Sequence, residues 1–302
     1  MHLTLQQLKL FESVVRHGSF TRAAEEMHLT QPAVSIQIKR LEDQAGVPLL
    51  EHVGKKMFPT AAGEVVYEAA AELLERLAAL NDEIESLKGE VRGPLRISVV
   101  TTGKYFMPHL LGHFLQRHPD VEPRLKFTNR ARVIERLMAN EDDFVVMGQV
   151  PEEERLVNYP FLENILGFVA PRDHPLAGRR NLELEEVVQA RFLAREPGSG
   201  TRAVIDRVLE EKGLTVEPYM ELGSSEAIKQ AVLAGIGVAV LSLHSVQLEQ
   251  ETGRLVVLDV RGFPIKRRWY AVHLKGKRLS LAARTFLTFI LTESHKMFPP
   301  DY

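Results

Sequence analysis

Residues 20–42 read FTRAAEEMHLTQPAVSIQIKRLE, and this stretch decides how the N-terminal part of the chain folds. A short helix is predicted first, because apolar residues recur there at helical spacing. These residues are Phe20, Ala23, Ala24 and Met27. Thr30 then offers a capping oxygen, and Pro32 suits the first turn of a second helix. Two short helices joined by a tight connection are therefore expected.

The second helix has one apolar and one polar face. Val34, Ile38 and Leu41 form the apolar face, which we expect to be buried. The outward positions are rich in groups that reach base edges and phosphates, as a DNA recognition helix requires. With the basic hairpin described next, the candidate DNA-binding residues are Thr30, Gln31, Pro32, Ala33, Ser35, Ile36, Lys39, Arg40, Lys55 and Lys56. The alternative is an ordinary helical hairpin with a solvated polar face.

A basic hairpin follows these helices. Residues 49–60, LLEHVGKKMFPT, have short apolar ends around a turn that carries Lys55 and Lys56 at its tip. With an opening helix over residues 5–17, the hairpin completes a predicted winged helix-turn-helix DNA-binding domain, residues 1–60. This domain has seven Lys/Arg against six Asp/Glu, so DNA contact must come from local placement of its cations. We expect the two lysines to contact phosphates and to supply salt-dependent affinity.

A long linker helix is predicted over residues 61–90. Its apolar residues step alternately by four and three positions, which is a 3.5-residue repeat. They are Val66, Ala70, Leu73, Leu77, Leu80, Ile84 and Leu87. Such a narrow seam favours a coiled coil between two chains, which would bring two winged domains to a promoter with two half-sites. The alternative is an amphipathic helix that packs on its own domain.

Residues 91–302 alternate between strand and helix patterns, which predicts an α/β domain with a largely parallel sheet. Its length suits two lobes, one over about residues 94–165 and 268–302 and the other over about residues 166–267. The chain would cross between them near residues 164–170 and return near residues 265–271. A bilobed α/β domain binds small molecules between its lobes, at the carboxyl ends of its strands.

Three turns that follow predicted strands are built from small hydrogen-bond donors. They are Thr101-Thr102-Gly103, the segment from Gly198 to Arg202, and Gly223-Ser224-Ser225. Each places hydroxyls and free backbone N–H groups at a helix N-terminus, which favours an anion. Arg202, Arg130 and Lys104 could add charge-assisted contacts. Any single turn is explained as well by helix capping, but three together favour an anionic or phosphorylated ligand.

Composition excludes several classes of protein. The chain has 302 residues, 45% of them hydrophobic, and no cysteine, which rules out disulfides and thiolate chemistry. No apolar run is long enough to span a bilayer and no secretory pattern is present, so we expect a cytoplasmic protein without a membrane partner. His109 and His113 lie four residues apart but without a metal-protease pattern, and no catalytic constellation is evident. We expect neither a metal site nor an enzyme.

Several segments resemble the LysR-type transcriptional regulators. The winged helix resembles them at residues 20–24, 29–35, 39–42, 48–50 and 59–63, and the likeness extends to near Phe289. Residues 140–143, 195–202, 221–232 and 267–270 are similar to the activators of Calvin-cycle (RuBisCO) operons, the CbbR type. The resemblance implies an effector domain like periplasmic binding proteins, a homotetramer built as a dimer of dimers, and RNA polymerase as a partner.

The same resemblance implies which residues bind the effector. They are Thr101, Thr102, Lys104, Asn129, Arg130, Gln149, Glu196, Thr201, Arg202 and Ser224. The implied effector is a sugar phosphate, another anionic carbon-fixation metabolite or a nicotinamide nucleotide, with no other cofactor. One departure is Ile36, where many members have arginine or another polar residue, so an apolar contact to a thymine methyl would replace a base hydrogen bond.

Three other functions remain open from the sequence. The first is a LysR-type regulator of amino-acid or aromatic metabolism, because the turns favour an anion without identifying it. The second is a solute-binding protein with an unrelated helical head, which the missing secretory pattern disfavours. The third is an enzyme on an α/β scaffold, which the lack of a catalytic constellation disfavours.

Overall fold

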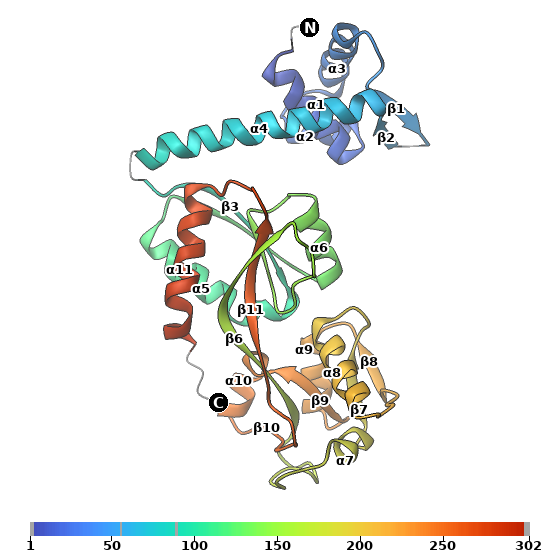
Figure 1. Cartoon of the computed structure of the whole chain (residues 1–302), viewed down its shortest axis with the longest axis vertical. Helices are drawn as coiled ribbons and strands as arrows, with labels where there is room; N and C mark the ends of the chain where they lie inside the picture. Colours follow the sequence, from blue (N-terminus) through green and yellow to red (C-terminus); the bar gives the residue numbers. More distant parts are fainter. Residues whose placement is uncertain (1–2, 55, 88–89, 299–302) are drawn as a thin grey trace. The chain divides into compact units, whose positions relative to one another are not determined.

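The computed structural model describes residues 3–54, 56–87 and 90–298. The chain divides into two compact units, Met1–Ile84 and Glu85–Tyr302 (Figure 1). The first unit holds the predicted winged helix and most of the long helix, and the second holds the predicted effector domain. Each unit has its own hydrophobic core, so each is described by itself.

The first unit is a winged helix-turn-helix, as predicted. Its elements are α1 (Leu5–His17), α2 (Phe20–Glu26), α3 (Gln31–Ala45), β1 (Leu50–Val53), β2 (Lys56–Pro59) and α4 (Ala61–Leu87). The predicted cap is present, because Thr30 Oγ1 accepts a hydrogen bond of 3.4 Å from the backbone N–H of Ala33. Val34, Ile38 and Leu41 are buried against α1 and α2, as their spacing predicted. β1 and β2 pair antiparallel to form the wing.

The residues of the seam predicted on α4 differ in their exposure within the single chain. Val66 packs against the core of the winged-helix unit, and Ala70 is fully buried within the single chain. These two positions therefore stabilise their own fold and leave little surface for a second chain. The next four, Leu73, Leu77, Leu80 and Ile84, are each more than a third exposed. Leu87 ends the helix, and its side chain lies outside the described residues.

The second unit is built on one mixed sheet with the strand order β4-β3-β5-β11-β6-β9-β7-β8, and β10 pairs with β6. The strands are β3 (Gly93–Val100), β4 (Val121–Thr128), β5 (Phe144–Met147), β6 (Leu156–Pro171), β7 (Phe192–Arg195), β8 (Met220–Leu222), β9 (Val238–Ser242), β10 (Leu255–Val257) and β11 (Ile265–Leu274). The prediction of a largely parallel sheet is correct only inside each lobe, where β3 pairs parallel with β4 and β5, and β7 with β8 and β9.

The two long strands β6 and β11 run antiparallel and belong to both lobes (Figure 1). They are the predicted crossing and return, and the predicted lobe boundaries fall inside them. β11 pairs with β5 of the first lobe, and β6 pairs with β9 of the second. Because both strands are shared, residues on them can face the space between the lobes.

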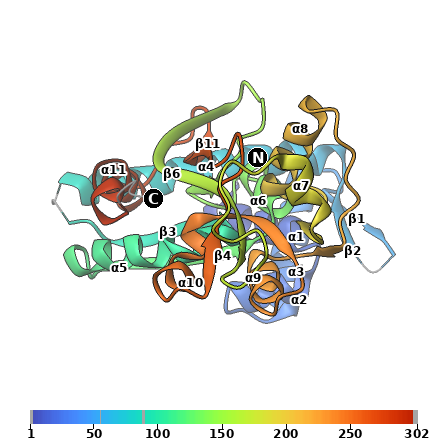
Figure 2. The same cartoon turned by 90° about the horizontal axis from the view of Figure 1, so that it is seen from below.

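Helices cover both faces of the sheet. In the first lobe, α5 (Met107–Arg117) and α11 (Leu281–Met297) lie side by side (Figures 1 and 2), and α6 (Arg130–Met138) covers the other face. In the second lobe, α7 (Leu184–Gln189) and α8 (Gly200–Glu211) pack on one face and α9 (Ser225–Leu233) on the other. Short turns η1 (Thr101–Tyr105) and η2 (Leu243–Ser245) and helix α10 (Gln247–Glu251) complete the unit. In the part of the chain described, no helix has the length and apolar character needed to cross a membrane.

Candidate functional site

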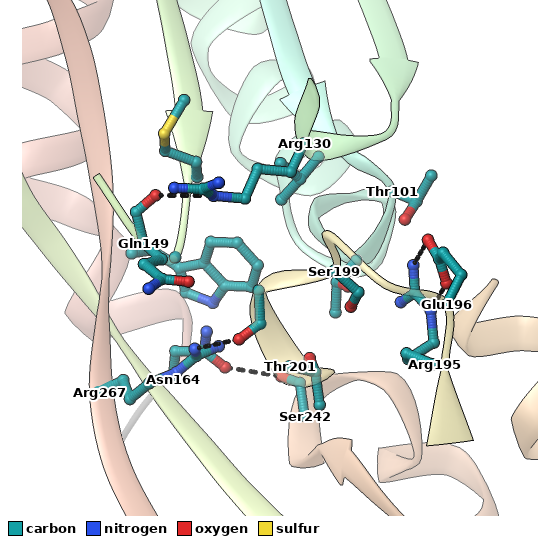
Figure 3. A pocket seen from close by; sticks show the side chains of 16 residues that line it. Thr101, Arg130, Gln149, Asn164, Arg195, Glu196, Ser199, Thr201, Ser242 and Arg267 are labelled. Atoms are coloured by element: carbon teal, nitrogen blue, oxygen red, sulfur yellow. Dashed lines mark hydrogen bonds and ion pairs between the residues drawn. The ribbon is translucent and has the colours of Figure 1, made fainter. Parts of the chain in front are cut away.

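The carboxyl ends of four strands meet at one pocket between the lobes (Figure 3). β3 and β5 reach it from the first lobe, and β7 and β9 reach it from the second, while β6 and β11 form its floor. This is where an open α/β sheet binds ligands. The pocket encloses about 480 Å³, part of it open to solvent. Its lining residues are Val100, Thr101, Thr102, Arg130, Met147, Gly148, Gln149, Asn164, Arg195, Glu196, Ser199, Gly200, Thr201, Ser242, Arg267 and Trp269.

Three guanidinium groups line this pocket, and among the residues that the structure describes only one of them has a carboxylate partner there. Arg195 donates from Nε and Nη2 to the two Glu196 oxygens at 2.7 and 2.8 Å. Burial lowers the pKa of Arg130, and burial likewise lowers the pKa of Arg267 to about 10. Both groups stay protonated at neutral pH, so the pocket carries two positive charges beyond the neutralised Arg195–Glu196 pair.

The N-terminus of α8 adds hydrogen-bond donors to the same space. Ser199 is the N-cap of this helix, but its hydroxyl makes no capping bond. Gly200 and Thr201 begin the helix, where backbone N–H groups have no partner within the helix and attract negative charge. Arg267 Nη1 donates to the carbonyl oxygen of Gly200 at 3.0 Å, which ties the floor strand to this turn. Cations, hydroxyls and a helix N-terminus together can bind an anion.

Gly148 gives the pocket floor its shape. It follows β5, and a Cβ built on it would come within 2.8 Å of Asn164 Nδ2 and 3.4 Å of Arg267 Nη2. Asn164 Oδ1 in turn accepts from the Ser242 hydroxyl at 3.0 Å. The side chains of β6 and β11 can therefore pass close to β5 only because residue 148 lacks a side chain.

Six of the ten predicted effector residues line the pocket, namely Thr101, Thr102, Arg130, Gln149, Glu196 and Thr201. All six lie within two residues of the end of a strand or the start of a helix. Thr102 is the exception in exposure, because it is buried and its hydroxyl lies 3.3 Å from that of Ser225. Gln149 and Arg130 meet at the pocket wall, where Arg130 Nε donates to the Gln149 carbonyl oxygen at 3.4 Å (Figure 3).

The other four predicted effector residues lie outside the pocket lining. Asn129 and Ser224 cap α6 and α9, and their side-chain oxygens accept from Arg132 and Ala227 N–H groups. These two are the capping residues that the sequence left as an alternative. The remaining two, Arg202 and Lys104, are held by carboxylates elsewhere.

Arg202 and Lys104 point to acidic partners of the second lobe. Arg202 pairs with Asp206 at 2.7 Å and Glu221 at 3.2 Å, and it donates to the carbonyl oxygen of Arg195. Lys104 lies 3.7 Å from Glu226. The Arg202–Asp206 pair has i,i+4 helical spacing, so this partner was readable from the sequence.

Sequence reasoning missed the pocket residues that lie within strands. Arg195 and Ser242 end β7 and β9, Asn164 lies in β6, and Arg267 and Trp269 lie in β11. The sequence of a strand shows which residues share one face of the sheet, but not which of the two faces lies toward the pocket. No local signal singles out Asn164 and Arg267, because the crossing strands also contain other polar residues, such as Glu163 in β6 and Lys266 and Arg268 in β11.

A second contact between the lobes is centred on Glu226 at the start of α9. Its carboxylate accepts from the Tyr105 hydroxyl and from Gln230, and it pairs with Lys229 at 3.3 Å. Lys229 also pairs with the buried Glu249 at 2.9 Å. Burial raises the pKa of Glu226, but these bonds outweigh it and lower the pKa to about 2. Burial and the same carboxylate raise the pKa of Tyr105. This contact is complete without a ligand.

In the first unit, none of the predicted DNA-binding residues that the structure describes is buried. Gln31, Pro32, Lys39, Arg40 and Lys56 are exposed, and Ile36 is 53% exposed. Thr30 is exposed as well, and Ala33 and Ser35 are partly exposed. Lys55 lies outside the described residues. The outward face of α3 is thus free to enter a major groove, as a recognition helix must.

Two sequence-family profiles match the chain. One is described as "Bacterial regulatory helix-turn-helix protein, lysR family" and matches residues 5–64, and the other as "LysR substrate binding domain" and matches residues 88–294. The RuBisCO operon transcriptional regulator of Allochromatium vinosum is 46% identical over 297 residues, which cover 98% of each protein. This chain belongs to the LysR family of transcriptional regulators.

Two further similarities narrow the position within the LysR family. The transcriptional activator CmpR of Synechocystis sp. is 44% identical over 95% of this chain and 94% of that protein. The solved regulatory domain of Synechocystis CcmR, in complex with 2-PG, is 44% identical with a TM-score of 0.65, covering 68% of this chain and 99% of that one. The resemblance to regulators of RuBisCO operons is confirmed. Because the LysR family consists of transcriptional regulators, the chain is not an enzyme.

Proposed function

We propose that this LysR-family regulator activates carbon-fixation genes in response to a small phosphorylated metabolite bound between the lobes of its effector domain. The observation that carries the proposal is the pocket with two guanidinium groups, Arg130 and Arg267, for which the described part of the chain supplies no carboxylate partner. A phosphoryl group is a dianion at neutral pH and accepts several hydrogen bonds, so it matches this excess of charge and donors. The Synechocystis domain, which binds 2-phosphoglycolate, supports the same class of ligand.

The DNA half of the proposal rests on α3 and the wing. α3 would enter the major groove, and the wing would contact phosphates beside it. The exposed Leu73, Leu77, Leu80 and Ile84 on α4 support pairing of two chains, which would carry two winged domains to two half-sites. We further propose a homotetramer built as a dimer of such dimers, located in the cytoplasm and acting on RNA polymerase at the promoter.

Regulation would follow from differential binding of the effector to two arrangements of the lobes. An effector that contacts residues of both lobes favours the arrangement in which those residues lie close together. A change in the effector domain then alters the placement of the winged domains and the bend of the DNA. The coupling is reciprocal, so operator DNA would change effector affinity by the same factor.

Calorimetric titration of the full-length protein tests the ligand class. The ligands are 2-phosphoglycolate, a sugar bisphosphate, a nicotinamide nucleotide and benzoate, with glycolate as the matched control without a phosphoryl group. We expect glycolate to bind at least about 100-fold more weakly than 2-phosphoglycolate, because it loses charge-assisted hydrogen bonds worth about 1.5–3 kcal/mol each. Binding of benzoate alone would overturn the proposal and indicate a regulator of aromatic metabolism.

A salt titration tests the DNA half. The Lys56→Ala variant should bind all DNA sequences more weakly and reduce the slope of log affinity against log salt by about one, because one phosphate contact is lost. Band-shift or anisotropy titrations between low and moderate salt measure this slope. An unchanged slope would remove the wing from the DNA contact.

A further inference from the structure

We propose that the indole N–H of Trp269 and the Nε–H of Arg267 together bind the acidic group of the effector. The inference rests on the proposed function and deepens it, because it assigns the contact that selects an acidic group. Trp269 is 2% exposed, and its Nε1 has no hydrogen-bond partner among the residues that the structure describes. Arg267 Nε is buried and equally without a partner among them. Buried donors are nearly always bonded in proteins, so two orphans in one pocket indicate a missing acceptor.

The side chains that carry the two donors lie on the same face of β11. They are two residues apart on β11, and alternate residues of a strand point to one face of the sheet. Both residues line the pocket, and Arg267 lies opposite Asn164 of β6 in the strand register. Asn164 Oδ1 accepts from Ser242 and bonds to neither donor. Within the part of the chain that the structure describes, no acceptor therefore bonds to Trp269 Nε1 or Arg267 Nε.

The chemistry of the two groups restricts that partner. Indole Nε1 and guanidinium Nε are donors only, so the partner must be an acceptor. The pocket already has a net positive charge from Arg130 and Arg267, so an anionic oxygen is favoured over a neutral carbonyl. An ammonium or another donor group would leave both N–H groups unpaired. A phosphoryl or carboxylate group meets both conditions.

The neighbours of Trp269 explain why its indole is held in place. Its ring packs on Phe106 with centroids 5.0 Å apart, and its Cζ3 would lie 3.5 Å from a Cβ at Gly148. The ring is therefore fixed by contacts that do not involve Nε1. Replacing it with phenylalanine removes the donor while keeping an aromatic ring against Phe106.

The chain contains one tryptophan, so this indole can be observed without interference. In full-length protein labelled with 15N-tryptophan, one indole N–H resonance is expected. Adding 2-phosphoglycolate should move this proton resonance downfield and slow its exchange with water, as a new hydrogen bond to an anionic oxygen requires. Glycolate and inorganic phosphate are the comparison ligands, because each carries part of the acidic chemistry.

Binding to the Trp269→Phe variant is the second measurement. We expect about a tenfold weaker affinity for 2-phosphoglycolate, equal to about 1.4 kcal/mol. The thermal midpoint without ligand should fall by several degrees, because phenylalanine leaves part of the space of the buried indole empty. The matched control is Tyr159→Phe, which removes a hydroxyl from the other crossing strand, opposite Ala271 and outside the pocket lining. Its affinity should be unchanged.

The outcomes separate this inference from the proposed function. If wild type binds 2-phosphoglycolate while the indole resonance stays in place and Trp269→Phe binds equally well, the indole contact is wrong and the phosphorylated effector stands. If wild type binds none of the phosphorylated ligands, both are overturned. Should Trp269→Phe fail to fold, the resonance of the wild-type indole still decides the inference.

Discussion

The two contacts between the lobes of the effector domain differ in how their charges are matched. At Glu226, one carboxylate meets Tyr105, Gln230 and Lys229, and a further carboxylate, Glu249, completes the pairing. In the pocket, burial lowers the pKa values of Arg130 and Arg267 and no carboxylate offsets it. Residues of the chain itself therefore pair the charges at Glu226, whereas none of the described carboxylates pairs the two guanidinium groups in the pocket.

This difference separates a structural contact from a binding site. Burying a charge without a partner is costly, so a fold keeps such a group only where another molecule supplies the partner. The Glu226 contact can hold the lobes in place without a ligand, while the pocket gains most of its pairing when an anion enters. Variants of the two contacts should therefore respond differently to the effector and to pH.

The largest effect is expected for Arg267→Met. Removing a buried guanidinium that contacts an anion loses charge-assisted hydrogen bonds of about 1.5–3 kcal/mol each, so affinity for 2-phosphoglycolate should fall about 100-fold or more. Stability without ligand should be unchanged or higher, because an unmatched buried charge is replaced by an apolar chain of similar length. Calorimetry and thermal unfolding measure the two quantities. Retained affinity with a clearly lower midpoint would make Arg267 a structural residue instead.

A smaller loss is expected for Gly148→Ala. Its Cβ would lie 2.8 Å from Asn164 Nδ2, so the pocket floor must shift. We expect about tenfold weaker binding and a stability loss of about 1–2 kcal/mol, typical of overpacking. The control is Gly112→Ala in α5, where the same Cβ meets no atom within 4 Å and should stabilise the helix slightly. Equal behaviour of the two variants would contradict the tight floor.

At the matched contact, Glu226→Gln should act mainly on stability. The pKa of Glu226 is lowered in the folded state from 4.5 to about 2, so its stabilisation is complete above pH 4.5 and is lost as pH falls towards 2. Because the side chain is 37% exposed, solvent screening reduces this to about 1 kcal/mol, or about 2–4 °C at neutral pH.

Thermal unfolding of wild type and Glu226→Gln from pH 7 to pH 3 tests this contact. The gap between their midpoints should narrow as the pH falls through the window below 4.5. A constant gap would mean that the carboxylate charge contributes nothing and that only the packing of the side chain matters.

The smallest effect on binding is expected for Arg202→Ala. Its guanidinium pairs with Asp206 and Glu221 outside the pocket lining, and ion pairs of this partly exposed kind contribute about 0–1 kcal/mol. Effector affinity should change by no more than about threefold, through the bond to the Arg195 carbonyl oxygen. Loss of all binding would show that the ligand contacts α8 beyond the residues that line the pocket.

Several features of the site could be predicted from the sequence because they are local. Thr101 directly follows β3, and Thr201 lies in the first turn of α8. Small hydroxyl residues at such turns favour an anion regardless of the rest of the fold. Asn129 and Ser224 carry the same local signal but act as helix caps. A turn pattern cannot tell these two uses apart, because both need a side-chain oxygen beside free backbone N–H groups.

The apolar repeat on α4 is a second local pattern that does not show what its residues contact. Its 3.5-residue repeat is a property of one helix, and it correctly gave an amphipathic helix of this length. Whether Val66 and Ala70 face a second chain or their own core depends on how the helix begins on the winged unit, which the repeat does not contain.

The sequence by itself determined the winged helix, the long helix, the strand and helix alternation and the family, since each depends on periodicity, capping or short motifs. Only the tertiary structure decided that Arg267 and Trp269 face the pocket and that Arg202 and Lys104 do not. The physical reason is pairing over long distances in the chain. β11 lies between β5 and β6, more than 90 residues earlier, and that register brings its alternate side chains to the ends of four strands. Partners so far apart in sequence leave no local pattern.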